Sequence, residues 1–394
     1  GWVESMVVDG VHAGLGGVLV FVPVLFGLYL MLALLEDTGY MARAAAVMDR
    51  SMRAVGIPGK AFLPMMVGFG CTVPAIYATR TLDSHRDRLL TGLITPFMSC
   101  GARLPVYVLL ASIFFAGNKS MVVFAMYVLG IAVAVLIGFL LSRTALREED
   151  PAPFVMVMPE FRMPNARTVW ILVRQRTLSF IKGAGTTILV ASMVVWLLLA
   201  IPLTGDGGFA DTDVEDSAFG VVAKGVAPTL EPLGFGDWEQ SGALLSGFVA
   251  KEVVVSTMAQ LYSVDGSDSA EPSGGFLDDV AEIGTSFVAA GRDTLLAIPR
   301  VIGLDFLDLG SQTETELQSA VRASFDESSG GKGRLAALGF MVFVLLYTPC
   351  IAAVSAFRQE FGTRWMWVSI LGQATIAWLG AFIVFRGGSM LGLG

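Results

Sequence analysis

The sequence has few charged residues and very few of the side chains that build most soluble active sites. Charged residues make up 15% of its 394 positions, and it contains two histidines and three cysteines. Three cysteines are too few for a disulfide framework, and all of them lie within apolar runs, so they carry no information about the redox compartment. The histidines, His12 and His85, lie outside those runs and lack the spacing of metal ligands.

Several motifs are also missing. The net charge of −8 offers no basic face, which excludes a nucleic-acid-binding role. The first ten residues, GWVESMVVDG, lack the positively charged start of a cleavable signal peptide. The glycine-rich stretch at 330–333 lacks the spacing of a phosphate-binding loop. No two cysteines form the close pair that a membrane thiol oxidoreductase or sensor needs, which argues against that class.

Long apolar runs dominate what is present. Hydrophobic residues make up 54% of the chain, and the mean hydropathy is +0.69. Runs of ~20 apolar residues are long enough to cross a bilayer as helices, and a transmembrane barrel would show weak alternation instead. The sequence therefore predicts an all-α polytopic membrane protein. The continuous spans are expected at 15–35, 89–115, 121–141, 186–203, 335–357 and 365–385.

Two further apolar runs, 61–79 and 243–262, are interrupted by glycines or carry charges at their centres, so we expect re-entrant or discontinuous helices there. Basic connections stay in the cytoplasm. The basic connections are 43–60, 80–88 and 143–182, and the acidic ones are 205–240 and 263–333. The run at 61–79 is then expected to enter from the cytoplasm and the run at 243–262 from outside, which predicts two inverted gate-type repeats.

Short internal similarities support this duplication. Residues 52–57 followed by 68–74 align with 230–235 followed by 247–253, and 96–100 corresponds to 347–350. The predicted organisation follows from these matches and from the loop charges. It comprises a first membrane repeat at 1–142, a cytoplasmic linker at 143–183, the first part of a second repeat at 184–262 with an acidic outer loop at 204–242, an acidic extracytoplasmic insertion at 263–333, and the rest of the second repeat at 334–394.

The alignment places Cys71, Cys100 and Cys350 at three of four equivalent breaks, and Ala250 with Lys251 at the fourth. A break frees backbone N–H and C=O groups, which in a bilayer must be satisfied by protein, water or an ion. Thiolate is a soft ligand that suits Fe²⁺, Zn²⁺ or Cu⁺, so the three cysteines are candidate metal ligands. The alternative for each is a small apolar filler.

Other residues at the breaks are candidates for a supporting role. Lys251 and Glu252 are adjacent charges in an apolar run, where ionisable residues are functional by default. Their alternative is mutual neutralisation or snorkelling toward the interface. The remaining supporting candidates are Gly68, Gly70, Pro74, Ser99, Gly101 and Pro349.

Five motifs together resemble the membrane domain of the FeoB family, the prokaryotic ferrous-iron transporters. They are EDTGYMARAAAVMDR at 36–50, GKAFLPMMVGFGCTVPAI at 59–76, RTLDSHRDRLLTGLITPFMSCGARLPVY at 80–107, KEVVVSTMAQLY at 251–262 and YTPCIAA at 347–353. The resemblance implies a multi-pass protein of the bacterial cytoplasmic (inner) membrane that takes up Fe²⁺ as substrate, with no permanently bound cofactor. It also implies that Cys71, Cys100 and Cys350 lie along the ion path.

One departure from the family is large. FeoB proteins carry an N-terminal GTP-binding domain, and no guanine-nucleotide motif occurs in these residues. GTP is therefore expected to act only through that domain, and this chain is not expected to be an enzyme. The domain should contact the cytoplasmic surfaces 42–60 and 143–182. The other expected partners are the lipid bilayer, a small cytoplasmic Feo accessory protein and a second copy of the chain.

Two further transport functions stay open. Thiols do not prefer Fe²⁺ over Zn²⁺ or copper by affinity alone, so the substrate is alternatively another divalent metal. Inverted repeats of this kind also resemble nucleoside carriers, which makes a small organic solute the second alternative. That function predicts aromatic and amide residues at the cavity, and the breaks are poor in Asn and Gln.

Overall fold

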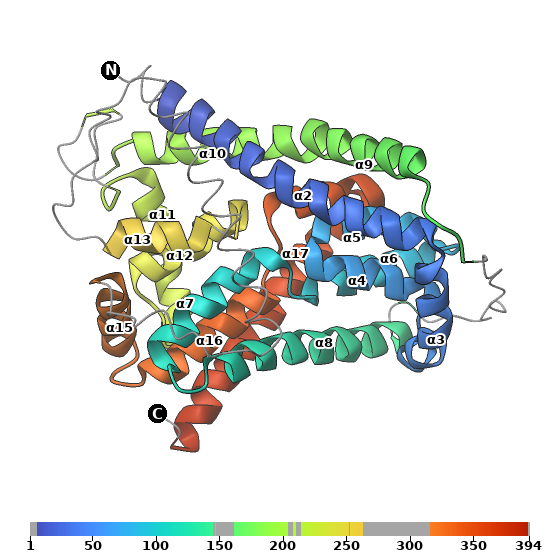
Figure 1. The fold of residues 1–394 in the computed structure, drawn as a ribbon. Coiled ribbons are helices and arrows are strands. Elements are labelled where there is room, and N and C mark those ends of the chain that lie inside the picture. The colour runs from blue at the N-terminus through green and yellow to red at the C-terminus, as the bar shows by residue number, and fades with distance from the viewer. Residues whose placement is uncertain are drawn as a thin grey trace, which may run out of the picture.

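A computed structural model describes residues 6–144, 146, 161–203, 208–209, 214–251, 253–262 and 316–392 (Figure 1). Within these ranges the protein is built from helices and contains no β-strand. The prediction of an all-α protein is confirmed.

The first half of the chain contains two long helices and five short ones. α2 and α8 have 25 residues each, about 37 Å of helix, which exceeds the ~30 Å of a bilayer core. The helices are α2 (Ala13–Asp37), α3 (Tyr40–Val55), α4 (Phe62–Gly70), α5 (Thr72–Ala78), α6 (His85–Ile94), α7 (Leu104–Phe114) and α8 (Lys119–Arg143). α3 leaves the end of α2 at 80°. The turn contains Gly39, whose φ of 79° favours glycine.

The second half contains the remaining helices of the described residues. These are α9 (Ala166–Phe180), α10 (Thr186–Ala200), α11 (Ala218–Leu230), α12 (Trp238–Val249), α13 (Val253–Tyr262), α15 (Glu316–Ser328), α16 (Gly333–Leu346) and α17 (Ile351–Met390). One π-helical turn, Ile181–Gly185, joins α9 to α10. Gly362 divides α17 into two helices, since its backbone is non-helical there (φ 85°, ψ 169°). Gly362 thus separates the segments expected at 335–357 and 365–385, but the first of these is not continuous, since α16 ends at Leu346 and α17 begins at Ile351. The span expected at 89–115 is likewise interrupted, between α6 and α7.

Four stretches are long and apolar enough to cross a membrane, and the bent pair of α2 and α3 is a fifth candidate. The four are His85–Phe114, Lys119–Arg143, Ala166–Ala200 and Gly333–Met390. The length and composition of these helices, over the described residues, fit a multi-pass membrane protein. α9 is continuous with α10 through the π turn, so this helix starts well before the span expected at 186–203.

In Figure 1, α2 runs beside α9 and α10 along one side of the molecule, and α8 runs along the opposite side. The short helices α4 to α7 lie between them, and the last part of α17 extends past α8 to the C-terminus. α3 and the start of α9 lie at one end of the molecule, whereas α11, α13 and α15 lie at the other. The segments expected on opposite sides of the membrane thus lie at opposite ends of the structure.

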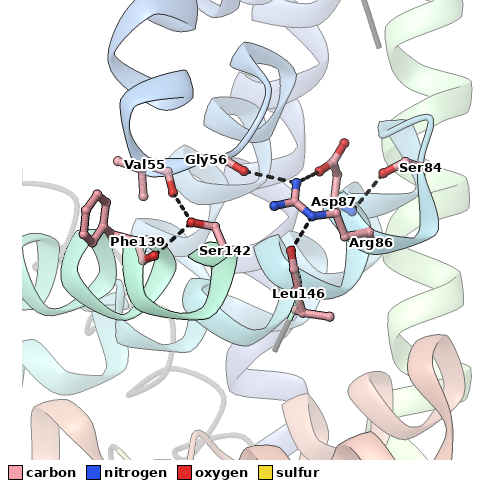
Figure 2. A network of polar contacts seen from close by, with 8 residues as sticks. All are labelled: Val55, Gly56, Ser84, Arg86, Asp87, Phe139, Ser142 and Leu146. Atoms are coloured by element: carbon pink, nitrogen blue, oxygen red, sulfur yellow. Dashed lines mark hydrogen bonds and ion pairs between the residues drawn. The ribbon is translucent and has the colours of Figure 1, made fainter. Parts of the chain in front are cut away.

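A polar network ties α3, α6 and α8 together at the first of these ends (Figure 2). Arg86 donates from Nε to the carbonyl of Leu146 at 2.7 Å and from Nη1 to the carbonyl of Gly56 at 3.1 Å. Ser142 donates to the carbonyl of Val55 at 3.0 Å. The positive φ of Gly56 (88°) and the Ser142 hydroxyl, 2.5 Å from where a Cβ would lie, both require glycine there.

The same end also joins the two halves of the chain. Glu360, whose side chain is 3% exposed, pairs with Arg80 and with Arg88, the latter at 3.2 Å. The Tyr77 hydroxyl donates to Oε1 of Gln359 at 2.9 Å. These contacts attach α5 and α6 to the first segment of α17, just before its turn at Gly362.

Candidate functional site: broken helices around three cysteines

The first break separates α4 from α5 at Cys71. Its backbone is extended (φ −153°, ψ 133°), and its N–H donates to the carbonyl of Val67 at 3.0 Å. Pro74 lies in the first turn of α5, where the missing N–H costs no helical bond. α4 and α5 pack against each other. The interruption predicted at 68–74 is therefore present as two short helices that meet at Cys71.

The second half repeats this backbone at Ala250, between α12 and α13. Its dihedral angles are φ −150° and ψ 122°, and its N–H donates to the carbonyl of Ser246 at 3.3 Å. α12 packs against α13 as α4 does against α5. The position that the sequence aligns with Cys71 thus has nearly the same local conformation. The inverted arrangement of the two halves across a membrane stays a prediction.

The other two cysteines each precede a helix after an extended break. Cys100 (φ −75°, ψ 161°) lies before the 3₁₀ turn Gly101–Arg103 that leads into α7. Cys350 (φ −55°, ψ 157°) lies before α17. All three cysteines are half-buried, and none forms a disulfide. Pro349 is buried next to Cys350.

Two of the breaks lie directly beside each other. A Cβ placed on Gly101 would lie 3.8 Å from the carbonyl oxygen of Gly70, so the residues next to Cys100 and Cys71 lie close to each other. A Cβ on Gly68 would lie 3.2 Å from Met98 and from Thr95. Gly70 and Gly101 are exposed, and their chain neighbours are half-buried. The glycines therefore allow two interrupted segments to approach closely.

Cys350 approaches this place from the other half of the chain. It packs with Cys71 against one apolar cluster built by α2, α5 and α17. Over the part of the chain that the structure describes, no three side chains among His, Cys, Asp and Glu come together closely enough to hold a metal ion at once. The structure thus shows neighbouring breaks but no closed three-ligand site.

Buried cations satisfy the carbonyls that the breaks release. Arg103 is fully buried and donates from Nη1 to Met98 O at 3.0 Å and from Nη2 to Pro96 O at 3.1 Å. Lys251 is 1% exposed, and its Nζ donates to Val344 O at 3.0 Å and to Tyr347 O at 3.4 Å. Sequence reasoning named Lys251 but missed Arg103. The available signal was an arginine inside an apolar span.

The other predicted residues fall in or next to this region. Ser99 is buried, and its hydroxyl donates to that of Tyr107 at 3.2 Å. Glu252 lies outside the described residues, so its expected role stays a prediction.

A cavity of about 580 Å³ lies next to the first break, among α2, α4, α5, α9 and α17. Its lining includes Val67, Val73 and Pro74, which flank Cys71, and it extends to Glu36 and Arg176, whose side chains pair at 2.9 Å. Aromatic and amide side chains also line it, namely Tyr29, Tyr77, Phe180, Gln175 and Gln359. Sequence reasoning did not foresee this cavity, because its walls come from helices far apart in the chain.

Helices of membrane-spanning length, interrupted near their centres and with polar groups gathered at the interruptions, are the build of membrane transporters. Residues 18–114 and 181–364 match the Gate family model, described as nucleoside recognition. Residues 123–176 match the model for the C terminus of ferrous iron transport protein B. The chain belongs to the FeoB family and corresponds to its membrane domain. The matched regions take up most of the chain.

Curated relatives agree with this assignment. The chain is 37% identical to the Fe(2+) transport protein A/Fe(2+) transporter FeoB fusion protein of Porphyromonas gingivalis, over 97% of this chain and 44% of the relative. It is 36% identical to the Fe(2+) transporter FeoB of Staphylococcus aureus (99% and 50%) and 37% identical to that of Salmonella typhimurium (98% and 49%). The chain spans about half the length of these relatives. No solved structure matches.

Proposed function

We propose that this chain transports Fe²⁺ across the bacterial cytoplasmic membrane through the broken helices, as part of a FeoB-like transporter. The observation that carries the proposal is the contact between the Cys71 break and the Cys100 break, where Gly101 lies against the carbonyl of Gly70. Relatives named as Fe(2+) transporters support the choice of substrate. Thiolates are ligands that suit Fe²⁺.

In this proposal Fe²⁺ is collected by the acidic outer loops and loses part of its hydration shell. It then passes sulfur ligands from Cys71, Cys100 and Cys350, helped by backbone carbonyls at the breaks. Because no three ligating side chains meet at once in the described residues, the ion is handed from one or two ligands to the next. A weak, multi-site path of this kind allows release, which a closed three-thiolate site would prevent.

The cavity beside the first break extends the path. It connects the residues around Cys71 with the end of the molecule where the basic connections lie. We propose that it is the cytoplasmic exit, with the Glu36–Arg176 pair at its wall. Glu36 is the acidic residue of that lining, and its pairing with Arg176 keeps the carboxylate neutralised in this conformation.

The proposed partners attach at the same end. A GTP-binding domain, carried by the full-length protein or by a separate chain, would contact 42–60 and 143–182. Arg86 links these two segments, because it donates to the carbonyl of Gly56 in the first and of Leu146 in the second (Figure 2). The Porphyromonas relative is named as a fusion with Fe(2+) transport protein A, which supports a small cytoplasmic accessory partner for this chain. Self-association also remains part of the proposal.

The test is Fe²⁺ uptake into proteoliposomes by the native polypeptide that contains this chain. We expect uptake by the unmodified protein, inhibition by Zn²⁺ through competition for the thiols, and reduced uptake by Cys71→Ser, Cys100→Ser and Cys350→Ser measured separately. Full uptake by all three variants would overturn the sulfur path but leave Fe²⁺ transport standing. No uptake by the unmodified, folded protein would overturn the function.

A small organic solute is the second candidate, and the cavity favours it. Its volume of about 580 Å³ falls in the range of sites for small organic ligands, ~300–1,000 Å³, and its aromatic and amide lining is what a nucleoside carrier needs. Uptake of a labelled nucleoside by the same proteoliposomes tests it. Nucleoside uptake that Fe²⁺ leaves unchanged would favour the organic substrate, whereas absent nucleoside uptake would eliminate it.

A further inference from the structure

The ammonium group of Lys251 lies in a site that is suited to any small cation. Its Nζ is 3.0 Å from Val344 O, 3.4 Å from Tyr347 O and 3.8 Å from the centroid of the Tyr347 ring. Carbonyl oxygens and the face of an aromatic ring both attract positive charge. The side chain is 1% exposed, so the charge lies in a region from which water is largely excluded.

The carbonyls are available because α16 stops at Leu346. Tyr347 is extended (φ −73°, ψ 166°), and the last carbonyls of a helix have no partner within it. Pro349, two residues further on, has no N–H to offer. Cys350 follows directly. These oxygens therefore form a cradle for a cation three residues before a proposed iron ligand.

Lys251 reaches this cradle from a different part of the chain. It is separated by 93 residues from Val344 and by 96 from Tyr347, and it lies at the junction of α12 and α13. In the first half, by contrast, Arg103 binds carbonyls only five and seven residues away. Arg103 moves with the carbonyls that it satisfies. Lys251 leaves its carbonyls whenever the α12–α13 pair moves relative to α16.

The α12–α13 pair also touches Tyr347 directly. A Cβ on Gly247 would lie 2.6 Å from the Tyr347 hydroxyl and 2.4 Å from Cγ2 of Val254, so the ring packs into a gap that only glycine leaves. The position of the α12–α13 pair is therefore coupled to that of the C-terminal end of α16.

We propose that Val344 O, Tyr347 O and the Tyr347 ring form a cation site on the iron path, and that Lys251 is its built-in occupant in this conformation. The inference rests on the proposed function, because the ion that displaces Lys251 is Fe²⁺. Two positive charges do not share one desolvated site. Lys251 thus closes the path because its ammonium group occupies the site in place of Fe²⁺, and movement of α12 and α13 opens the path.

The experiment replaces the charge and measures Fe²⁺ influx without GTP. The native polypeptide that contains this chain is reconstituted with an iron-quenched dye inside the vesicles. We expect Lys251→Met to raise the nucleotide-free influx at least about tenfold, because a like charge leaves the path, and Lys251→Arg to keep it low. Lys224→Met, which removes a surface lysine paired with Glu215, is the matched control and leaves influx unchanged.

A second readout does not depend on iron transport. With Cys71 and Cys100 replaced by serine, Cys350 is modified by a cationic and by an anionic methanethiosulfonate of similar size. Lys251→Met is expected to raise the cationic-to-anionic rate ratio about tenfold. Thermal unfolding is measured for each variant, so that only folded protein is compared.

The outcomes separate the inference from the proposed function. If the unmodified protein transports Fe²⁺ but folded Lys251→Met shows neither increased influx nor a changed reagent ratio, Lys251 only satisfies carbonyls and the inference is overturned. If no variant transports Fe²⁺ yet the reagent ratio changes, the cation site stands and the proposed function falls.

Discussion

The two helix pairs α4–α5 and α12–α13 break at almost the same backbone conformation and carry different chemistry. Cys71 and Ala250 differ by only 3° in φ (−153° against −150°) and 11° in ψ (133° against 122°). A thiol stands at the first break, and an alanine followed by a buried lysine stands at the second. The backbone conformation determines where N–H and C=O groups are left without a helical partner. The side chain at the break determines whether a metal ion or a protein group binds there.

The halves also differ in how they satisfy the neighbouring break. Arg103 serves carbonyls of its own segment, whereas Lys251 serves carbonyls of a helix in another part of the chain. The first arrangement holds a break in one shape. The second depends on how two segments lie relative to each other, and it therefore changes when they move.

Removing Arg103 should have the largest effect. Arg103→Met leaves the carbonyls of Pro96 and Met98 buried without donors, and unmet buried polar groups cost ~1–3 kcal/mol each. We expect a loss of about 3–5 kcal/mol in unfolding free energy, measured by denaturant unfolding in detergent. Arg103→Lys, which keeps a charge and a donor, should recover part of it. A loss below about 1 kcal/mol in Arg103→Met would show that the first break is held by other contacts.

Serine substitutions at the two equivalent breaks, Cys71 and Ala250, should have different effects on Fe²⁺ uptake. Cys71→Ser is expected to lower Fe²⁺ uptake by about 10–100-fold, since it removes a proposed metal ligand. Ala250→Ser alters the same backbone position without removing a ligand and should keep uptake within about twofold. The readout is initial uptake in proteoliposomes at equal amounts of folded protein. Equal losses in both variants would mean that the breaks matter only as backbone.

Glycine to alanine substitutions compare the packing of the two breaks. The new Cβ of Gly247→Ala would lie 2.4 Å from Val254 Cγ2, whereas that of Gly68→Ala would lie 3.2 Å from Met98 and Thr95. Overpacking of a tight site costs ~1–3 kcal/mol. We therefore expect about 2 kcal/mol of destabilisation at Gly247 and less than about 1 kcal/mol at Gly68, read from thermal midpoints. The reverse order would contradict the closer packing of the second break.

The smallest expected effect is a pH dependence at the start of α12. Asp237 precedes α12, and burial raises the pKa of its carboxyl above the usual value, with the hydrogen bond from Ser324 opposing this and the charge of Glu327 adding to it. α4 has no acidic residue in its first turn. The folded state therefore binds this proton more tightly than the unfolded state does, and the burial cost at Asp237 is relieved as pH falls from neutral through the raised pKa.

Below the unfolded pKa near ~3.9 this gain is complete. Thermal midpoints of the unmodified protein and of Asp237→Asn between pH 7 and pH 4.5 provide the measurement. The unmodified protein should gain stability relative to the variant on acidification. Parallel pH curves would show that Asp237 is solvated like an ordinary carboxylate.

Much of the architecture followed from patterns local in the sequence. Apolar runs predicted the long helices, and the string of glycines with Pro74 predicted the break at Cys71. The apolar runs at 335–357 and 365–385 predicted two helical segments, which Gly362 separates, but not the break between Leu346 and Ile351 inside the first run. Breaks of this kind are visible because glycine and proline change backbone preference wherever they occur.

The contacts that make the site were not visible in the same way. Lys251 stood out as a charge in an apolar run, but its partners Val344 and Tyr347 lie over 90 residues later. Arg103 was not named as a candidate at all. The cavity required walls from α2, α5, α9 and α17. The route of iron past the three thiols stays a prediction.

The order of amino acids fixed which segments are apolar enough for a bilayer, where their helices are interrupted and which family the chain belongs to, because these depend on residues close together in the chain. Only the folded molecule decided that Gly101 lies close to the carbonyl of Gly70, that Arg103 and Lys251 donate to the released carbonyls, and that a cavity lies next to the first break. Those outcomes depend on how helices far apart in the sequence pack against one another, and the surfaces in contact are defined only when the chain has folded.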